Sequence, residues 1–167
     1  DRMTTKVGSN CLLMAYVHLA HDAFVGDNCV IANSANIAGH VTIGNWVVIE
    51  GVVAIQQFIE VGDHAFVAGG SLVRKNVPPF IKVAREPLSY IGVNSIGLRR
   101  RGFSDDQVRQ LEDMYRTLFV YNKNQDDIDL FENITNKDSL ISESITSLLK
   151  VRIAALLAPF SPLSFLT

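Results

Sequence analysis

The sequence predicts an all-β solenoid, a parallel β-helix of hexapeptide repeats, followed by a small α-helical C-terminal subdomain. The first observation is an aliphatic residue at every sixth position from Val7 to Val73, twelve in succession. The second is a small or β-branched residue four positions after nearly every one of them. A helix of 3.6 residues per turn or a strand of period two gives no repeat of six, whereas stacked parallel coils do.

Glycines eighteen residues apart set the length of one coil. They follow the repeated aliphatic residue at Gly8, Gly26, Gly44 and Gly62. We expect three hexads to form the three sides of one triangular coil, with coils at 7–24, 25–42, 43–60 and 61–78. Because glycine, and Asp or Asn beside it, tolerates a left-handed backbone, we expect these glycines to supply the positive φ of one corner.

The repeat stops at Val77-Pro78-Pro79-Phe80, because proline cannot donate a ladder hydrogen bond. We therefore assign residues 1–79 to the β-helix and 80–103 to an irregular connector. Residues 104–167 are assigned to the helical subdomain. Its first helix should open with a capping box from Ser104 to Gln107. Its apolar stripe comprises Val108, Leu111, Met114, Tyr115, Leu118 and Phe119. Two further helices are expected at 126–134 and 139–157.

Composition excludes several classes of protein. The chain has 167 residues, 48% of them hydrophobic and 19% charged, with a net charge of -2. Such a chain is neither disordered nor a general nucleic-acid binder. No apolar run reaches the roughly 18 residues of a transmembrane segment. We expect a cytoplasmic protein, in which the two cysteines, Cys11 and Cys29, are reduced and fill small interior positions.

Histidines gather at one position of the coil. His21, Gly39 and Gln57 are spaced by eighteen, and Asp22 and His40 directly follow the first two. With His18 three residues before His21, these polar side chains should lie around one corner, where Gly39 leaves open space. Three interpretations remain open at this point. The corner could be a metal site, a solvated turn, or an acid–base site in which a carboxylate orients an imidazole.

Five segments together resemble the UDP-N-acetylglucosamine O-acyltransferases, which begin lipid A synthesis. They are LLMAYVHLAHD at 12–22, NSANIAGHVTIG at 33–44, QQF at 56–58, VPPF at 77–80 and GVNSIGLRRRGF at 92–103. The resemblance runs from about Val7 to Phe119. Hexads alone would equally suit a serine acetyltransferase, a sugar N-acyltransferase or a carbonic anhydrase.

The resemblance implies a left-handed β-helix, assembled as a homotrimer with its sites between subunits. The implied reaction transfers an (R)-3-hydroxyacyl chain from acyl carrier protein to the 3-hydroxyl of UDP-N-acetylglucosamine. It implies no metal and no resident cofactor, since the acyl donor is carried on the phosphopantetheine of acyl carrier protein. The family has several more coils before Val7, so we expect this chain to be N-terminally truncated.

The resemblance also implies roles for ten residues. His21 matches the general base and Asp22 its acidic partner. Gly39 matches a backbone donor at the oxyanion hole, and Gly69 a position that limits acyl-chain length. The remaining matches are substrate-binding: His18 and His40 position substrate, Gln57 contacts the sugar, and Asn94, Arg100 and Arg101 hold the uridine diphosphate.

Two departures from the family pattern leave alternatives open. Gln56 stands where the family usually has a fourth histidine, and Ile96 where it often has an acidic residue. One alternative is the related N-acyltransferase of the same pathway, which acts on an amine. The other is a trimeric solenoid fragment without activity.

Overall fold

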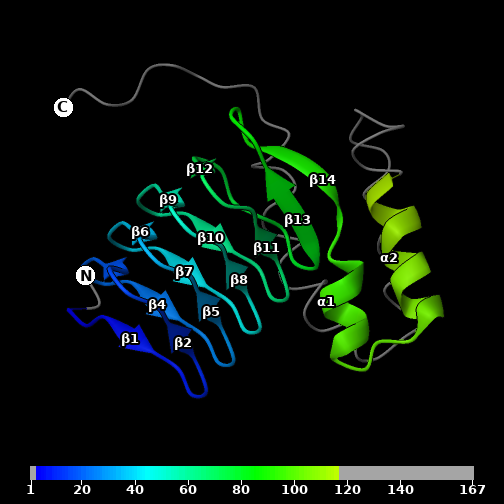
Figure 1. The fold of residues 1–167 in the computed structure, drawn as a ribbon, viewed down its shortest axis with the longest axis horizontal. Coiled ribbons are helices and arrows are strands. Elements are labelled where there is room, and N and C mark those ends of the chain that lie inside the picture. The colour runs from blue at the N-terminus through cyan, green and yellow to red at the C-terminus, as the bar shows by residue number, and fades with distance from the viewer. Residues whose placement is uncertain (1–2, 117–167) are drawn as a thin grey trace. The chain divides into compact units, whose positions relative to one another are not determined.

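Four stacked triangular coils form a parallel β-helix in the computed structural model, which describes residues 3–116 (Figure 1). Each coil contains three strands of two residues. The twelve strands are β1 Lys6–Val7, β2 Leu12–Leu13, β3 His18–Leu19, β4 Phe24–Val25, β5 Val30–Ile31, β6 Asn36–Ile37, β7 Thr42–Ile43, β8 Val48–Ile49, β9 Ala54–Ile55, β10 Glu60–Val61, β11 Phe66–Val67 and β12 Leu72–Val73.

The strands stack in register into three parallel sheets. Their orders are β1-β4-β7-β10, β2-β5-β8-β11 and β3-β6-β9-β12. Paired residues lie eighteen apart, as Val7 with Val25 and His18 with Asn36. Backbone bonds join the coils at the same interval, for example from the N–H of His18 to the carbonyl of Ala35 at 2.9 Å. The predicted β-helix and its eighteen-residue coil are thus confirmed.

The two predicted columns of apolar residues fill the interior. The second residue of each strand points inward, and so does the small residue four positions later. From Ala23 to Val67 every member of both columns is buried. In the first coil the same columns are more open, since Val7 is 41% and Leu13 39% exposed.

Both cysteines are free thiols at the small interior position, as expected. Cys29 is buried and Cys11 partly buried. Each thiol approaches a carbonyl one coil on, with Sγ 3.1 Å from the oxygens of Gly26 and Gly44 respectively. Burial raises the pKa of Cys29 to about 11, so its thiol stays protonated at neutral pH.

Left-handed backbone occurs at every corner, but not at Gly8, Gly26, Gly44 or Gly62. Residues with φ near 60° recur every six positions, at Asn10, Tyr16, Asp22, Asn28, Ser34, His40, Trp46, Val52, Phe58 and His64. This conformation costs a non-glycine residue roughly 1–2 kcal/mol. A hydrogen bond from the backbone N–H of the corner residue to a carbonyl of the preceding coil offsets this cost. The N–H of His40, for instance, donates to the carbonyl of His21 at 3.2 Å.

The expectation that Gly8, Gly26, Gly44 and Gly62 supply positive φ is therefore wrong. Their φ values are ordinary, and the left-handed residue comes two positions later. These glycines are needed because the next coil lies too close for a side chain. A methyl group on Gly26 would lie 2.7 Å from Oδ1 of Asn45 and 2.8 Å from the backbone of Gly44.

Side-chain oxygens one coil apart form a ladder beside these glycines. Oδ1 of Asp27 accepts from the N–H of Ser9 at 2.6 Å. Oδ1 of Asn45 accepts from the N–H of Asp27 at 2.8 Å, and Oδ1 of Asp63 accepts from the N–H of Asn45 at 2.6 Å. The neutral amide of Asn45 thus separates two carboxylates that would otherwise be neighbours on one corner.

Residues 80–103 are not irregular as expected. They contain a hairpin of β13 Ile81–Ala84 and β14 Ser89–Val93, followed by helix α1 Ser95–Arg100. Strand β13 pairs in parallel with β11, and β14 pairs antiparallel with β13, so the hairpin extends that sheet to six strands. Its register with β11 is sixteen rather than eighteen, because Pro78 and Pro79 cut the last coil short.

Helix α2 Asp105–Arg116 begins at the predicted capping box. The N–H of Ser104 donates to Gln107 Oε1 at 2.9 Å, and the N–H of Gln107 donates to Ser104 Oγ at 3.2 Å. The predicted stripe is buried from Val108 to Tyr115, and the Tyr115 hydroxyl donates to the carbonyl of Pro79 at 2.8 Å. Leu118, Phe119 and the helices expected at 126–134 and 139–157 lie outside the described residues.

Neither helix between residues 3 and 116 has the length and apolar character needed to cross a membrane.

We predict that Asn45→Asp lowers the melting temperature at neutral pH and low salt. The new carboxylate keeps the ladder acceptor but stands about 5 Å from a carboxylate on each side. Each such contact costs about 1 kcal/mol in water. Thermal unfolding in 0.05 M and 1 M salt measures the effect, which should largely disappear at high salt.

Asn45→Ala is the matched control, since it removes the acceptor without adding charge. Its melting temperature should fall by a similar amount at both salt concentrations. If the melting temperature of Asn45→Asp fell equally at both salt concentrations, repulsion between carboxylates would not be the cause.

Candidate functional site

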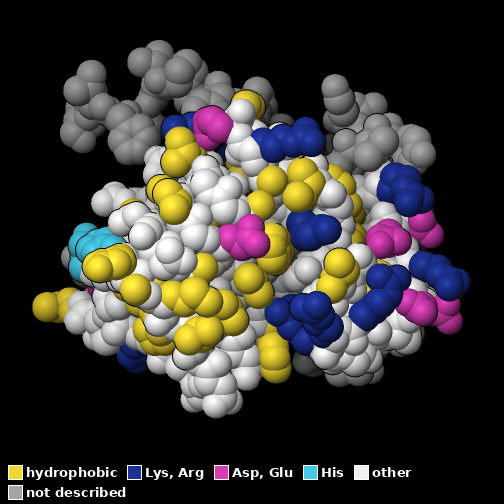
Figure 2. Space-filling view, in the orientation of Figure 1, with side chains coloured by type: hydrophobic (Ala, Val, Ile, Leu, Met, Phe, Trp, Pro, Cys, Tyr) yellow, Lys and Arg dark blue, Asp and Glu magenta, His cyan; other side chains and the backbone are white. Residues whose placement is uncertain are grey.

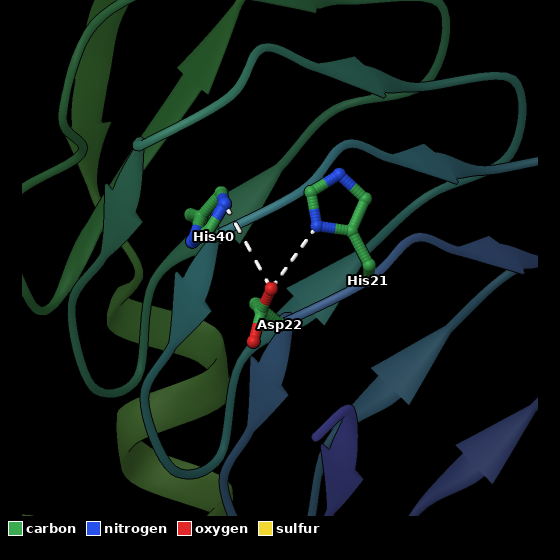
Figure 3. A group of neighbouring side chains, drawn as sticks. All are labelled: His21, Asp22 and His40. Carbon is green, nitrogen blue, oxygen red and sulfur yellow. Dashed lines mark hydrogen bonds and ion pairs between the residues drawn. The ribbon is translucent and has the colours of Figure 1, made fainter. Parts of the chain in front are cut away.

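His21, Asp22 and His40 come together at the corner that joins the β3-β6-β9-β12 sheet to the β1-β4-β7-β10 sheet (Figure 3). Nδ1 of His21 lies 3.1 Å from Oδ2 of Asp22, and Nε2 of His40 lies 3.8 Å from the same oxygen. His21 and Asp22 follow β3, and His40 occupies the equivalent place one coil on, after β6. The eighteen-residue register therefore assembles this group.

Asp22 is the buried member of the group, with a relative exposure of 6%. Its Oδ1 accepts the N–H of Thr4 at 3.3 Å. The hydrogen bond from His21 lowers the pKa of the Asp22 carboxyl, against the opposing effect of desolvation. The carboxylate is thus ionised at neutral pH and holds the His21 ring with its proton on Nδ1, which leaves Nε2 able to accept a proton.

Gly39 lies directly against the His21 ring. A methyl group at this position would be 2.7 Å from both Cε1 and Nε2 of the imidazole. Gly39 is buried, and no acceptor for its N–H is recorded within residues 3–116. The open space that the sequence predicts at this position is therefore occupied by the ring of His21.

Phe58 is a member of this corner that the sequence argument did not single out. Its ring stacks on His40, with centroids 4.8 Å apart and planes 14° apart. His40 in turn meets the edge of His21 at 5.0 Å and 85°. Phe58 shares the coil position of Asp22 and His40, so the eighteen-residue spacing was the signal that could have identified it.

The metal interpretation left open by the sequence has a defined candidate here. One ligand atom each from His21, Asp22 and His40 lies within 4.8 Å of the others, and these are ligand types that zinc accepts. The 3.1 Å separation of His21 Nδ1 and Asp22 Oδ2 is also an ordinary hydrogen-bond distance. A hydrogen-bonded His–Asp pair therefore accounts for this distance without an ion.

The other predicted residues of the β-helix have no recorded contact to this group, and Gly69 lies at a different corner, between β11 and β12. His18 is exposed on β3, on the outer face of the sheet, and Gln57 is exposed at the corner beside Phe58. Gly69 is exposed on the outside of the last coil, where its N–H donates to Oε2 of Glu50 at 2.8 Å.

Two of the three predicted nucleotide-binding residues lie at a different corner. Asn94 is buried, and its amide donates to the carbonyl of His64 at 2.9 Å. The Arg101 guanidinium lies 5.4 Å from the ring centroid of Trp46 and 3.3 Å from Nδ1 of His64. Arg100 is exposed. Trp46 and His64 were not singled out from the sequence, although they are eighteen residues apart.

We predict that Gly39→Ala displaces the His21 imidazole, because the added methyl cannot share space with the ring. Histidine side-chain NMR should show shifted resonances for His21 and unchanged ones for His18. The melting temperature should change little, because His21 is largely exposed and its ring can swing outward.

Gly51→Ala is the matched control, at the same hexad position of another corner. Its methyl would meet nothing closer than the carbonyl of Asn33 at 3.3 Å. Unmoved His21 resonances in Gly39→Ala would contradict the close contact.

Two family models match the sequence. The model described as UDP N-acetylglucosamine O-acyltransferase, domain 2, matches residues 76–151. The bacterial transferase hexapeptide model matches residues 4–39.

Curated relatives agree with these models. The acyl-[acyl-carrier-protein]–UDP-N-acetylglucosamine O-acyltransferases of a Sulfurihydrogenibium species and of Fusobacterium nucleatum are 60% and 56% identical to this chain. Both alignments cover 71% of this chain, and 44% and 46% of the relatives. The chain thus spans about half the length of the curated relatives that it matches.

Solved structures give the same result. The UDP-N-acetylglucosamine O-acyltransferase of Moraxella catarrhalis superposes with a TM-score of 0.82 at 36% identity. That superposition covers 90% of this chain and 59% of the other. By sequence and by fold, the chain belongs to the family of UDP-N-acetylglucosamine O-acyltransferases.

Proposed function

We propose that the protein transfers an (R)-3-hydroxyacyl chain from acyl carrier protein to the 3-hydroxyl of UDP-N-acetylglucosamine, the first step of lipid A synthesis. The observation that carries the proposal is the His21–Asp22 pair set against Gly39, in a chain of this family. Such a pair can abstract a hydroxyl proton at neutral pH, which is what a direct O-acyl transfer requires.

The first step is attack of the sugar hydroxyl on the thioester. Nε2 of His21 takes the hydroxyl proton while the oxygen bonds to the thioester carbon. Asp22, held ionised by its lowered pKa, stabilises the imidazolium that forms. The carbonyl oxygen gains negative charge, and we assign the backbone N–H of Gly39 as its donor, because Gly39 lies against the His21 ring and no acceptor for that N–H is recorded within residues 3–116.

The second step is collapse of the tetrahedral intermediate. The carbon–sulfur bond breaks, the carbonyl re-forms as an ester, and the thiolate of phosphopantetheine leaves. The imidazolium of His21 returns its proton to that sulfur. No resident cofactor or metal takes part in this scheme, because the acyl donor brings its own activated thioester.

We assign the sugar and nucleotide to the polar residues around the two corners. His18, His40 and Gln57 would position the glucosamine ring. Arg100 would contact the diphosphate, because a guanidinium pairs well with phosphate oxygens. Asn94 and Arg101 would hold the segment that carries Arg100 against the β-helix, through their contacts with His64. We further infer that sites of this kind lie between the subunits of a cytoplasmic homotrimer.

The positive charges of the described residues are concentrated in one part of the chain, as expected of a protein that binds an acidic acyl carrier protein. Nine of the ten Lys and Arg residues between 3 and 116 come after residue 73. On the face in Figure 2, basic side chains accordingly gather over the hairpin and the helices. Lys75, Lys82 and Arg85 belong to this basic region, which would steer an acidic carrier protein toward the site.

We predict that Gly69→Met shortens the acyl chain that the enzyme accepts. Gly69 needs no positive φ, and the nearest atom to an added methyl is the Gly51 carbonyl at 3.3 Å, so its smallness is not a structural requirement. Across a series of donors of increasing chain length, kcat/KM for the longest chain that the wild type accepts should fall roughly tenfold or more, because a larger side chain excludes methylenes. Donors several carbons shorter should react as well as before. Equal losses with both donors would contradict a role in chain length.

We predict that His21→Ala lowers kcat by about 10² to 10⁴-fold, the usual contribution of a general base. Asp22→Asn should also lower kcat, because the amide cannot stabilise the imidazolium. The assay follows acyl transfer from acyl carrier protein to UDP-N-acetylglucosamine. Size-exclusion chromatography should show the same assembly for both variants as for the wild type.

Asn36→Ala is the control on the neighbouring strand, and should leave kcat unchanged. Retained turnover in His21→Ala would contradict the general-base assignment. Transfer to the amine of the 3-acyl-glucosamine nucleotide alone would indicate the related N-acyltransferase. Absence of transfer to either acceptor from the wild-type protein would indicate a solenoid without activity.

A further inference from the structure

Four aromatic rings form a cluster at the corner that joins the β1-β4-β7-β10 sheet to the β-sheet containing β11. We call Trp46, His64, Phe80 and Phe103 the ring cluster. His64 is parallel to Trp46 at a centroid distance of 6.3 Å and to Phe80 at 5.4 Å. Phe103, just after α1, meets the edges of His64 and Phe80 at 5.2 and 6.1 Å. The cluster therefore joins the β-helix to the segment that carries the arginines.

Arg101 is the charged member of this contact. Its guanidinium lies 5.4 Å from the Trp46 ring centroid, within the range of a cation–π interaction. Its terminal nitrogen is also 3.3 Å from Nδ1 of His64. Because a guanidinium only donates, Nδ1 must be the acceptor. Burial and the charge of Arg101 lower the pKa of His64 to about 4, so the neutral ring that this bond needs is present at pH 7.

Asn94 secures the other end of the same segment. Its side-chain amide donates to the His64 carbonyl at 2.9 Å, and its backbone N–H donates to Phe80 at 2.7 Å. A methyl on Gly97 would lie 2.6 Å from the Asn94 amide, so only glycine permits this packing. Helix α1 is thus held to the ring cluster just before its first residue and again just past its last.

The three consecutive arginines consequently have different surroundings. Arg99 donates from Nε to Asp105 Oδ1 at 2.7 Å, and Arg101 is held by Trp46 and His64. Arg100 is exposed, and within residues 3–116 no ion pair, ring contact or side-chain hydrogen bond of Arg100 is recorded. Of the three, its guanidinium has the freedom to meet a ligand.

We propose that Trp46 and His64 are positioning residues that hold Arg101, and through it helix α1, so that Arg100 is presented to the diphosphate of the nucleotide sugar. The proposal rests on the proposed function for the identity of the ligand. It reassigns Arg101 and Asn94 from ligand contacts to parts of the support. Neither Trp46 nor His64 touches substrate in this scheme, and both act through Arg101.

Steady-state kinetics on the full-length protein is the first test. His64→Phe keeps the ring stack but removes the acceptor, and Arg101→Gln removes the charge over Trp46. Each should raise KM for UDP-N-acetylglucosamine roughly tenfold, as expected for loss of one charge-assisted contact, with little change in kcat. Arg109→Gln makes the same charge change on α2, away from the cluster, and should leave KM unaltered.

A double-mutant cycle separates support from direct contact. If His64 acts through Arg100, then Arg100→Ala/His64→Phe should have the same KM as Arg100→Ala alone. If the KM of the double variant rose by the product of the two single effects, the proposal would be overturned, because His64 would then contribute independently of Arg100. An unchanged KM in His64→Phe would overturn it as well.

Fluorescence tests the contact itself without any activity. Trp46 is the single tryptophan of the chain, so its emission reports directly on the guanidinium above the indole. Arg101→Gln should alter that emission, whereas Arg100→Ala and Arg109→Gln should leave it as in the wild type. Unaltered emission in Arg101→Gln would overturn the proposal. If the wild type binds no UDP-N-acetylglucosamine, the proposed function fails, while this measurement still decides whether Arg101 is held by Trp46.

Discussion

Hydrogen bonding between coils in an eighteen-residue register is the constraint on which the rest of this structure depends. Each strand of the β-helix, from β1 to β12, has only two residues, so none is stable alone and each is held by strands in the neighbouring coils. The register also forces a left-handed residue at each corner. Side chains as bulky as Trp46 and Phe58 accept that conformation, because their N–H groups bond to the preceding coil.

Because of this register, residues eighteen apart in the sequence stack above one another, and the side chains of one such column can form a site. At one corner Asp22, His40 and Phe58 stack, and His21 precedes the first of them. Gly39, one coil after His21, gives the imidazole its place. A buried carboxylate with a lowered pKa, an imidazole bonded to it through Nδ1 and a glycine packed against that ring are thus brought together by stacking alone. No long loop or separate domain is needed to bring them together.

Much of the fold and of the first site could be predicted from the sequence, because both depend on a strict period. Twelve aliphatic residues at intervals of six place the interior, and the spacing of His21 and His40 places them on one corner. What could not be predicted lies where the period fails. The hairpin of β13 and β14 follows two prolines that break the register, and its pairing with β11 is a long-range contact without a repeat. The role of Gly26 could not be predicted either. Glycine is required there because the next coil lies too close for a side chain, and not because of the φ of Gly26 itself.

Asn94 and Arg101 both contact residues of the β-helix, which the basic motif in the sequence does not indicate. Three adjacent arginines have equal charge in the sequence, yet their neighbours assign them to different tasks. Asp105 pairs with Arg99, and Trp46 and His64 hold Arg101. Trp46 and His64 precede Arg101 by 55 and 37 residues, so only the folded structure reveals these two neighbours. The same left-handed corner geometry therefore brings His21 and Asp22 together with His40 in one column, and in another it holds the segment that carries Arg100.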